Sequence, residues 1–186
     1  MYKRKNGGCR MKLLYSNILP LGTEEDQETI MDCFNEQMKM ADRVEIAVGY
    51  TSNASLAELD RLVNECNISK VCLNIGMYFI EGMPEGAYHT AIKINEKWQE
   101  AGIGEIRVVK AFKYHGKLFC FYKDGNPFSA IIGSANLGVI KLEASNRRQY
   151  EISAITTDEQ EVAEIAEHIE KLKMPNCSEN IALVKN

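Results

Sequence analysis

Apolar residues recur along the chain with two different periods. Spacings of three or four residues, typical of a helix with one buried face, mark the segments 23–40, 52–66, 85–101 and 158–173. Alternation with a period of two, typical of a strand, marks 44–48, 71–75 and 106–108, and we expect a short first strand at 13–15. The two patterns take turns over the first half of the chain, which predicts a β-α-β arrangement.

Residues with capping preferences indicate where these helices begin and end. Thr23 precedes an acidic turn and is expected to open the first helix, whose apolar positions continue to Met38. Ser52 or Asn53 can cap the second helix. Gly102 is expected to end the third, because glycine accepts the left-handed conformation that commonly follows a helix.

The pattern changes after residue 110. The segments 117–123, 129–132 and 150–156 are typical of strands, yet no long helix follows each of them. The sequence Asp124-Gly125-Asn126-Pro127 predicts a hairpin turn between the first two. We therefore expect an α/β fold with a mixed β-sheet flanked by helices on both faces. It should form one domain over 1–186, with its core at 12–172 and loose tails, including the chain after Pro175.

Composition narrows the class of protein. The 186 residues are 45% hydrophobic and 26% charged, which supports a buried core and excludes a disordered, collagen-like or coiled-coil chain. No apolar run approaches the roughly 20 residues that a membrane-spanning helix needs. No hydrophobic stretch of signal-peptide type follows the basic N-terminus. We expect a cytoplasmic protein without a membrane partner.

The six cysteines form no recognisable disulfide or metal-binding framework. The sequence has no CxxC, and none of its three histidines lies at a ligand spacing from another histidine or a cysteine pair. We expect reduced thiols, no metal site and no cofactor. Four of the cysteines lie in apolar patterns and should be buried: Cys33, Cys66, Cys72 and Cys120.

The overall charge of −4 hides a strong polarity along the chain. In residues 104–150, eight basic residues stand against three acidic ones, so this segment carries +5 and the remainder carries −9. Such a distribution could steer an anionic ligand to the middle segment, although ordinary surface charge explains it equally well.

The middle segment also contains the pattern that carries chemistry. His115 and Lys117 are two residues apart at the start of a predicted strand, so their side chains should project to the same face. An imidazole and an ammonium group aimed at one place can bind an anion while one of them attacks or moves a proton. Gly133-Ser134-Ala135-Asn136 then follows another predicted strand, and such a turn can offer N–H groups, a hydroxyl and an amide to phosphate oxygens.

His-x-Lys followed by Gly-Ser-x-Asn resembles the HKD motif of the phospholipase D superfamily. That pattern has an aspartate five residues after the lysine, where this chain has Tyr122. Asp124 belongs to the expected hairpin, so we do not assign it the role of that aspartate. Three features resemble the restriction-endonuclease branch of the superfamily. They are the missing aspartate, an interval from Lys117 to Gly133 that is longer than in the lipases, and the opening segment 14–50. The resemblance covers most of 12–172, with a specific motif only at 115–136.

The resemblance implies roles for individual residues. His115 would attack phosphorus and form a covalent phosphohistidine. Lys117 and Asn136, with Gly133 and Ser134, would bind the phosphate. The superfamily also places an acidic residue on the next strand, where Glu151 is the best match and would fix the tautomer of His115. Two alternatives to this assignment are that Glu143 is the acid, or that Glu151 faces solvent beside Arg147 or Arg148.

A second histidine must protonate the leaving oxygen, but neither His89 nor His168 lies in an HxK pattern. Superfamily members with one motif dimerise, so the resemblance implies a homodimer with His115 of both subunits in one site. It implies a metal-independent DNA phosphodiesterase, the catalytic domain of a type II restriction endonuclease. The alternatives are a lipid phosphodiesterase or phosphatidyltransferase, which could dock on a membrane through 79–83, and a non-catalytic nucleic-acid-binding module.

Overall fold

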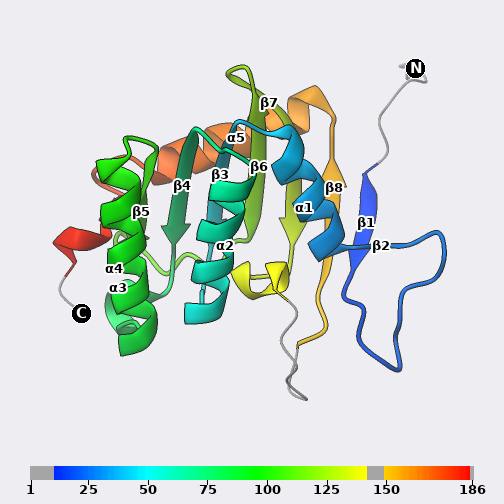
Figure 1. The fold of residues 1–186 in the computed structure, drawn as a ribbon, viewed down its shortest axis with the longest axis horizontal. Helices are drawn as coiled ribbons and strands as arrows, with labels where there is room; N and C mark the ends of the chain where they lie inside the picture. Colours follow the sequence, from blue (N-terminus) through cyan, green and yellow to red (C-terminus); the bar gives the residue numbers. More distant parts are fainter. Residues whose placement is uncertain (1–10, 142–148, 185–186) are drawn as a thin grey trace, which may run out of the picture.

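The structure, a computed structural model, describes residues 11–141 and 149–184, and within them nine strands form one sheet (Figure 1). The strands are β1 (Lys12–Tyr15), β2 (Glu28–Thr29), β3 (Arg43–Val48), β4 (Lys70–Ile75), β5 (Gly104–Val109), β6 (Leu118–Lys123), β7 (Asn126–Gly133), β8 (Ile152–Thr156) and β9 (Ser178–Asn180). The helices are α1 (Ile30–Met40), α2 (Asn53–Glu65), α3 (Tyr78–Glu81), α4 (Glu85–Glu100) and α5 (Glu159–Leu172), with short 3-10 helices η1 (Leu137–Ile140) and η2 (Ile181–Leu183).

The sheet is mixed, with strand order β2-β1-β8-β7-β6-β3-β4-β5-β9. The strands β3, β4 and β5 are parallel, because a helix returns the chain between each pair. The strands β6, β7 and β8 are antiparallel to their neighbours, and β1 pairs with β8 in the same way. The predicted mixed α/β sheet is confirmed.

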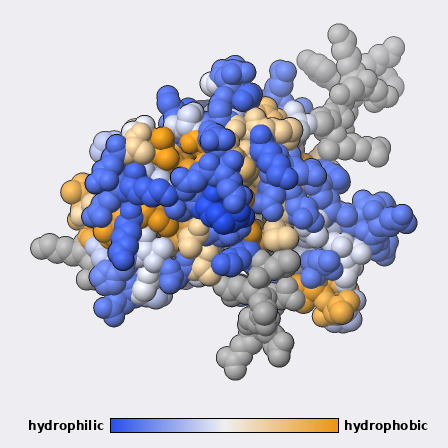
Figure 2. Space-filling view, viewed as in Figure 1, coloured by the Kyte–Doolittle hydropathy of each residue, from blue (hydrophilic) through white to orange (hydrophobic). Residues whose placement is uncertain are grey.

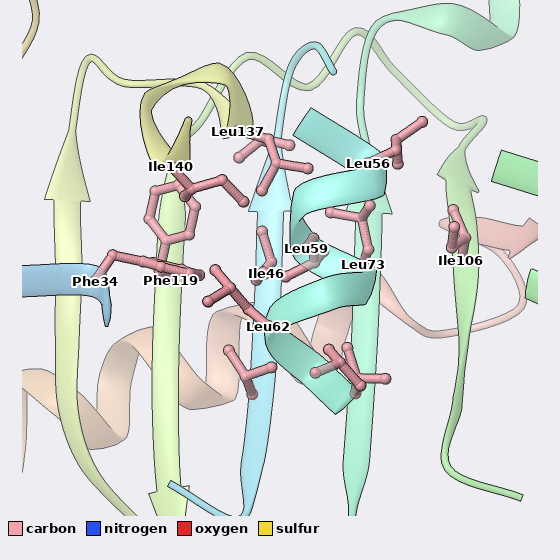
Figure 3. Close-up of a cluster of buried hydrophobic side chains, with 14 of the residues drawn as sticks. Phe34, Ile46, Leu56, Leu59, Leu62, Leu73, Ile106, Phe119, Leu137 and Ile140 are labelled. Atoms are coloured by element: carbon pink, nitrogen blue, oxygen red, sulfur yellow. The ribbon is translucent and has the colours of Figure 1, made fainter. Parts of the chain in front are cut away.

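Helices cover both faces of the sheet, as predicted. The helices α1, α2 and α4 lie on one face and α5 lies on the other, behind the strands in Figure 1. Between the sheet and the first group lies the larger core, in which Phe34 packs edge-on against Phe119 (Figure 3). Phe34 also packs edge-on against Phe121. The outer side of these helices, which faces the viewer in Figure 2, is mainly hydrophilic, so each helix buries one stripe.

Local signals placed most elements correctly. Ser52 caps α2 with a side-chain bond to the Ser55 N–H, and Asp124 and Gly125 form the hairpin turn with positive φ values of 50° and 81°. Thr23, in contrast, does not open a helix. The helix α1 begins seven residues later, where the Thr29 side chain accepts a bond from the Asp32 N–H.

Residues 176–184, which follow Pro175, are not loose, contrary to the expectation. The strand β9 pairs antiparallel with β5, and the Ser178 side chain donates to the Leu172 carbonyl at 2.6 Å. Ile181 is buried beneath α4. The prediction failed because β9 is a short polar edge strand, whose hydrogen bonds come from a distant part of the chain.

Five strands present their ends at one edge of the sheet, the lower edge in Figure 1. The register pairs Tyr15 of β1 with Ile152 of β8, and Gly133 of β7 with Ser153. Leu118 of β6 is opposite both Ile132 and Ala47. The C-terminal ends of β1, β3 and β7 and the N-terminal ends of β6 and β8 are therefore neighbours, although they are far apart in sequence.

Candidate active site

His115 lies just before β6, in the connection that crosses this edge. Its neighbour Tyr114 donates a backbone bond to the Gly76 carbonyl at 3.1 Å. A Cβ atom at Gly76 would lie 2.0 Å from the Tyr114 carbonyl oxygen, so only glycine allows the two segments to approach this closely. The His115 side chain is exposed, and its ring lies 5.9 Å from the Tyr50 ring in an edge-to-face arrangement. The connection thus holds an accessible imidazole in a fixed place.

Lys117 is buried, in contrast to His115. Only 6% of Lys117 is exposed, and its ammonium group donates to the His115 carbonyl oxygen. Burial lowers the pKa of Lys117, and the negative charge of Glu151 opposes this shift only in part. A buried ammonium group with one protein partner keeps donors for a ligand and interacts with an anion more strongly than it would in water.

Asn136 reaches the same place from the end of β7. Its Oδ1 accepts a bond from the Tyr50 N–H at 3.0 Å, which leaves its Nδ2 group as a donor. A Cβ atom at Gly49 would lie 3.0 Å from His115 Cδ2 and 3.5 Å from Asn136 Oδ1. His115 and Asn136 therefore approach the same point at the end of β3.

Ser134 and Glu151 form the next part of the site. The Ser134 hydroxyl donates to the Glu151 carboxylate and accepts a bond from the Ile152 N–H at 3.1 Å. Ser16, after β1, fixes Glu151 from the other side. The Glu151 N–H donates to Ser16 Oγ at 3.0 Å, and the Ser16 N–H donates to the Glu151 carbonyl at 3.1 Å. The described hydrogen bonds thus connect the Glu151 side chain to Ser134, and not to His115.

The backbone of Gly133-Ser134 serves the sheet instead of forming an open cradle. The Gly133 N–H donates to the Lys117 carbonyl at 3.4 Å and the Ser134 N–H to the Ile152 carbonyl at 3.0 Å. Only glycine fits at position 133, because an added Cβ would lie 2.3 Å from Ser153 Oγ. These two N–H groups of the turn that was expected to offer donors to phosphate are therefore occupied by backbone partners.

The structure brings together His115, Lys117, Ser134, Asn136 and Glu151 at one edge, although they come from three different segments. The alternative acid Glu143 and the neighbours Arg147 and Arg148 lie outside the described residues. Sequence patterns gave no indication of Ser16, Gly49 or Tyr50, whose roles arise from contacts with residues 65 to 135 positions away. Only the end of a predicted strand near Gly49 could have drawn attention to that position.

A cavity of about 630 Å³ adjoins this site. It lies between the β1–β8 end of the sheet, the N-terminal ends of α1 and α2, and η1, and it shares Asn136 and Glu151 with the site. Its remaining walls are Tyr15, Ser16, Asn17, Ile18, Thr29, Met31, Asp32, Ser52, Gly138, Val139, Lys141 and Gln149.

The described residues contain neither a cluster of metal ligands nor a membrane-spanning helix. Within 11–141 and 149–184, no three His, Cys, Asp or Glu side chains gather as a metal site would require. None of the helices in these ranges has the length and apolar character needed to cross a bilayer.

Comparison with known families identifies the chain. A model of the NgoFVII restriction endonuclease N-terminal PLD domain matches residues 28–186. The chain belongs to this family. It is therefore a member of the phospholipase D superfamily, as its motif suggested, and the family supports a phosphodiesterase of the nuclease type. No curated protein matches the chain.

Solved structures share the fold at low sequence identity. Nuc from Salmonella typhimurium, a phospholipase D family member, is 13% identical with a TM-score of 0.58, covering 92% of this chain and 97% of Nuc. NucT from Helicobacter pylori is 17% identical with a TM-score of 0.60, covering 90% of this chain and 97% of NucT. Phosphatidylserine synthase from Haemophilus influenzae is 12% identical with a TM-score of 0.57, covering 95% of this chain and 41% of the synthase.

Proposed function

We propose that this domain cleaves DNA phosphodiesters through a covalent phosphohistidine, without a metal ion, as the catalytic domain of a type II restriction endonuclease. The observation that supports it best is the pairing of an exposed His115 imidazole with a buried Lys117 ammonium and the Asn136 amide at one sheet edge. A nucleophile beside fixed donors is what in-line attack on a phosphodiester requires. Family membership makes DNA the substrate to test first.

In the first step, a ring nitrogen of His115 forms a bond to phosphorus while the bond from phosphorus to the leaving oxygen breaks. The leaving oxygen takes a proton from a second imidazolium. Water then attacks phosphorus and gives its proton to that second histidine, and the P–N bond breaks to release a phosphomonoester. Lys117 and Asn136 hold the non-bridging oxygens through both steps. Together they supply the charge and donors that a metal ion supplies in other nucleases.

Glu151 and Ser134 support this arrangement. The carboxylate lies close enough to Lys117 to act on its pKa, so it favours the charged ammonium form that the phosphate needs. Ser134 fixes that carboxylate by its hydroxyl bond. In the proposed enzyme, Glu151 also stabilises the positive charge that the His115 ring carries once it is bonded to phosphorus.

The second histidine must come from another copy of the chain. His89 is exposed on α4, where its Nε2 lies 3.7 Å from Glu85. His168 lies on α5, with its ring 5.9 Å from that of Tyr114, which faces the smaller core on the other side of the sheet. None of the described contacts joins either of them to His115. We therefore propose a two-fold homodimer that places His115 of each subunit on either side of one phosphate.

A lipid substrate is the second candidate, because the domain also shares its fold with a phosphatidylserine synthase. In the segment suggested for membrane docking, Phe79 and Ile80 are 43% and 69% exposed, but Met83 is buried. Two apolar side chains on one short helix give a smaller insertion surface than interfacial helices present. DNA is thus the better-supported substrate.

The proposal is tested by phosphodiester cleavage in excess EDTA. Plasmid DNA and bis(p-nitrophenyl) phosphate would be incubated with the wild type, with His115→Ala and with His89→Ala as a matched control. We expect EDTA-resistant cleavage of both substrates by the wild type and by His89→Ala. Loss of the nucleophile in His115→Ala should lower the rate by about 10³-fold or more.

Other outcomes have clear meanings. Cleavage that requires an added divalent metal, or that survives loss of His115, would refute the phosphohistidine mechanism. Cleavage of phosphatidylcholine vesicles but not of plasmid would favour the lipid candidate. A folded protein that binds DNA but cleaves neither diester would be a binding module of the same fold.

A further inference from the structure

The cavity beside the site has walls unlike those of the phosphate site. Much of its surface is apolar and comes from Tyr15, Ile18, Met31 and Val139. A flat, mainly apolar group with polar edges fits such walls better than an anion does. Burying apolar surface is favourable, whereas burying a charge without a partner costs free energy.

The charged groups among the described walls of the cavity also disfavour phosphate. Asp32 and Glu151 contribute two carboxylates to the walls, and Lys141 contributes the one ammonium group among the described lining residues. Carboxylates repel phosphate oxygens but accept hydrogen bonds from N–H and O–H donors. Walls of this kind suit the uncharged group bonded to a phosphate better than the phosphate itself.

Size and position agree with this assignment. A volume of about 630 Å³ lies within the range of roughly 300–1,000 Å³ that holds small organic ligands, and it exceeds the volume of one nucleoside. Since Asn136 and Glu151 belong to both the cavity and the site, a group in the cavity is directly adjacent to a phosphate at Lys117. A base inside a stacked duplex could not enter a concave pocket without leaving the stack.

We infer that the cavity binds the nucleoside attached to the scissile phosphate, with its base turned out of the stack. This inference rests on the proposed phosphodiesterase function and deepens it. The base lies against the apolar walls, and its polar edge and the sugar hydroxyl or N–H donors face Asp32 and Glu151. The domain then cleaves most readily where a nucleotide is unpaired or easily unstacked.

Gly138 offers a way to close the cavity without disturbing the fold. It lines the cavity in η1, its φ is not positive, and an added Cβ would meet no atom within 4 Å. The first atom of a new side chain at this wall therefore meets no clash, and Gly138→Trp is the variant chosen to fill the cavity. Gly86 in α4 is the matched control, because it is also exposed, its Cβ position is equally open, and it lies outside the cavity.

The test compares three chromogenic substrates that release p-nitrophenol: methyl p-nitrophenyl phosphate, thymidine 5′-(p-nitrophenyl phosphate) and thymidine 3′-(p-nitrophenyl phosphate). We expect the wild type to favour at least one thymidine diester over the methyl diester by about tenfold or more in kcat/KM, as base-stacking contacts allow. Gly138→Trp should reduce that ratio to near one while it still cleaves the methyl diester. Gly86→Trp should retain the wild-type ratio.

The controls separate the two proposals. If His115→Ala cleaves the methyl diester as fast as the wild type, the proposed function fails whatever the ratios are. If the wild type cleaves all three substrates equally, or if Gly138→Trp keeps the full preference for thymidine, the nucleoside site is refuted and the catalytic assignment stands. Circular dichroism and thermal unfolding of both tryptophan variants show that the comparison is made between folded proteins.

Discussion

The side chains of the site lie in contrasting environments, because Lys117 is buried and His115 is exposed to solvent. A local pattern of three residues identified both positions but not this division of roles. Burial depends on β3 and β7, which flank β6 and come from 43–48 and 126–133, so it could not be read from residues 115–117 alone.

Burial of Lys117 gives a prediction about pH. The lowered pKa means that the ammonium group loses its proton at a lower pH than an ordinary lysine, and the hold on phosphate is lost with it. Activity of the wild type on bis(p-nitrophenyl) phosphate should therefore fall as pH rises through this lowered pKa. In Lys117→Arg, whose guanidinium stays charged, the fall should move to higher pH even if the maximal rate drops by about tenfold or more. Identical alkaline limbs in kcat/KM against pH would assign the titration to another group.

Turns and helix starts were predictable where a signal is local and strong. The Asp124–Gly125 turn is an example, because a two-residue hairpin requires residues that accept positive φ. Thr23 was wrongly predicted to open the first helix because acidic residues follow both Thr23 and Thr29. Only the packing of Ile30 and Phe34 against the sheet decides which of these two threonines caps the helix. The short strand β9 could not be predicted, since its pairing partner is about 70 residues away.

The join between β7 and β8 carries a prediction about stability. Gly133→Ala would force its Cβ to within 2.4 Å of the Ser153 Cα and 2.6 Å of the Ile152 carbonyl oxygen, so the strands must separate. We expect the free energy of unfolding to fall by about 1–3 kcal/mol, with loss of activity because Ser134 and Glu151 move. In the control Gly86→Ala, the Cβ meets open space in a helix, so stability should be unchanged or slightly higher. Urea denaturation of both variants measures the difference, and equal stabilities would contradict the close packing described.

At the scale of the whole molecule, the proposed need for two copies of His115 in one site can be tested by mixing subunits. If wild type and His115→Ala are mixed in equal amounts and allowed to exchange, only dimers with two intact histidines should be active. Random pairing leaves about a quarter of the dimers intact, so activity per dimer should fall to about a quarter. Sedimentation analysis would confirm that exchange has occurred. A fall to about one half would mean that each chain acts alone.

The strand β1 precedes the residues that match the family model, which begin at Glu28. Yet β1 pairs with four of the five residues of β8 and places Ser16 against Glu151. A protein shortened to the matched region would leave the N–H and C=O groups of β8 without their partners on that side. An open strand of this kind pairs readily with other chains. The strand β1, with the two-residue strand β2 beyond it, thus covers β8, and a protein without β1 is expected to associate with its own copies through the exposed strand.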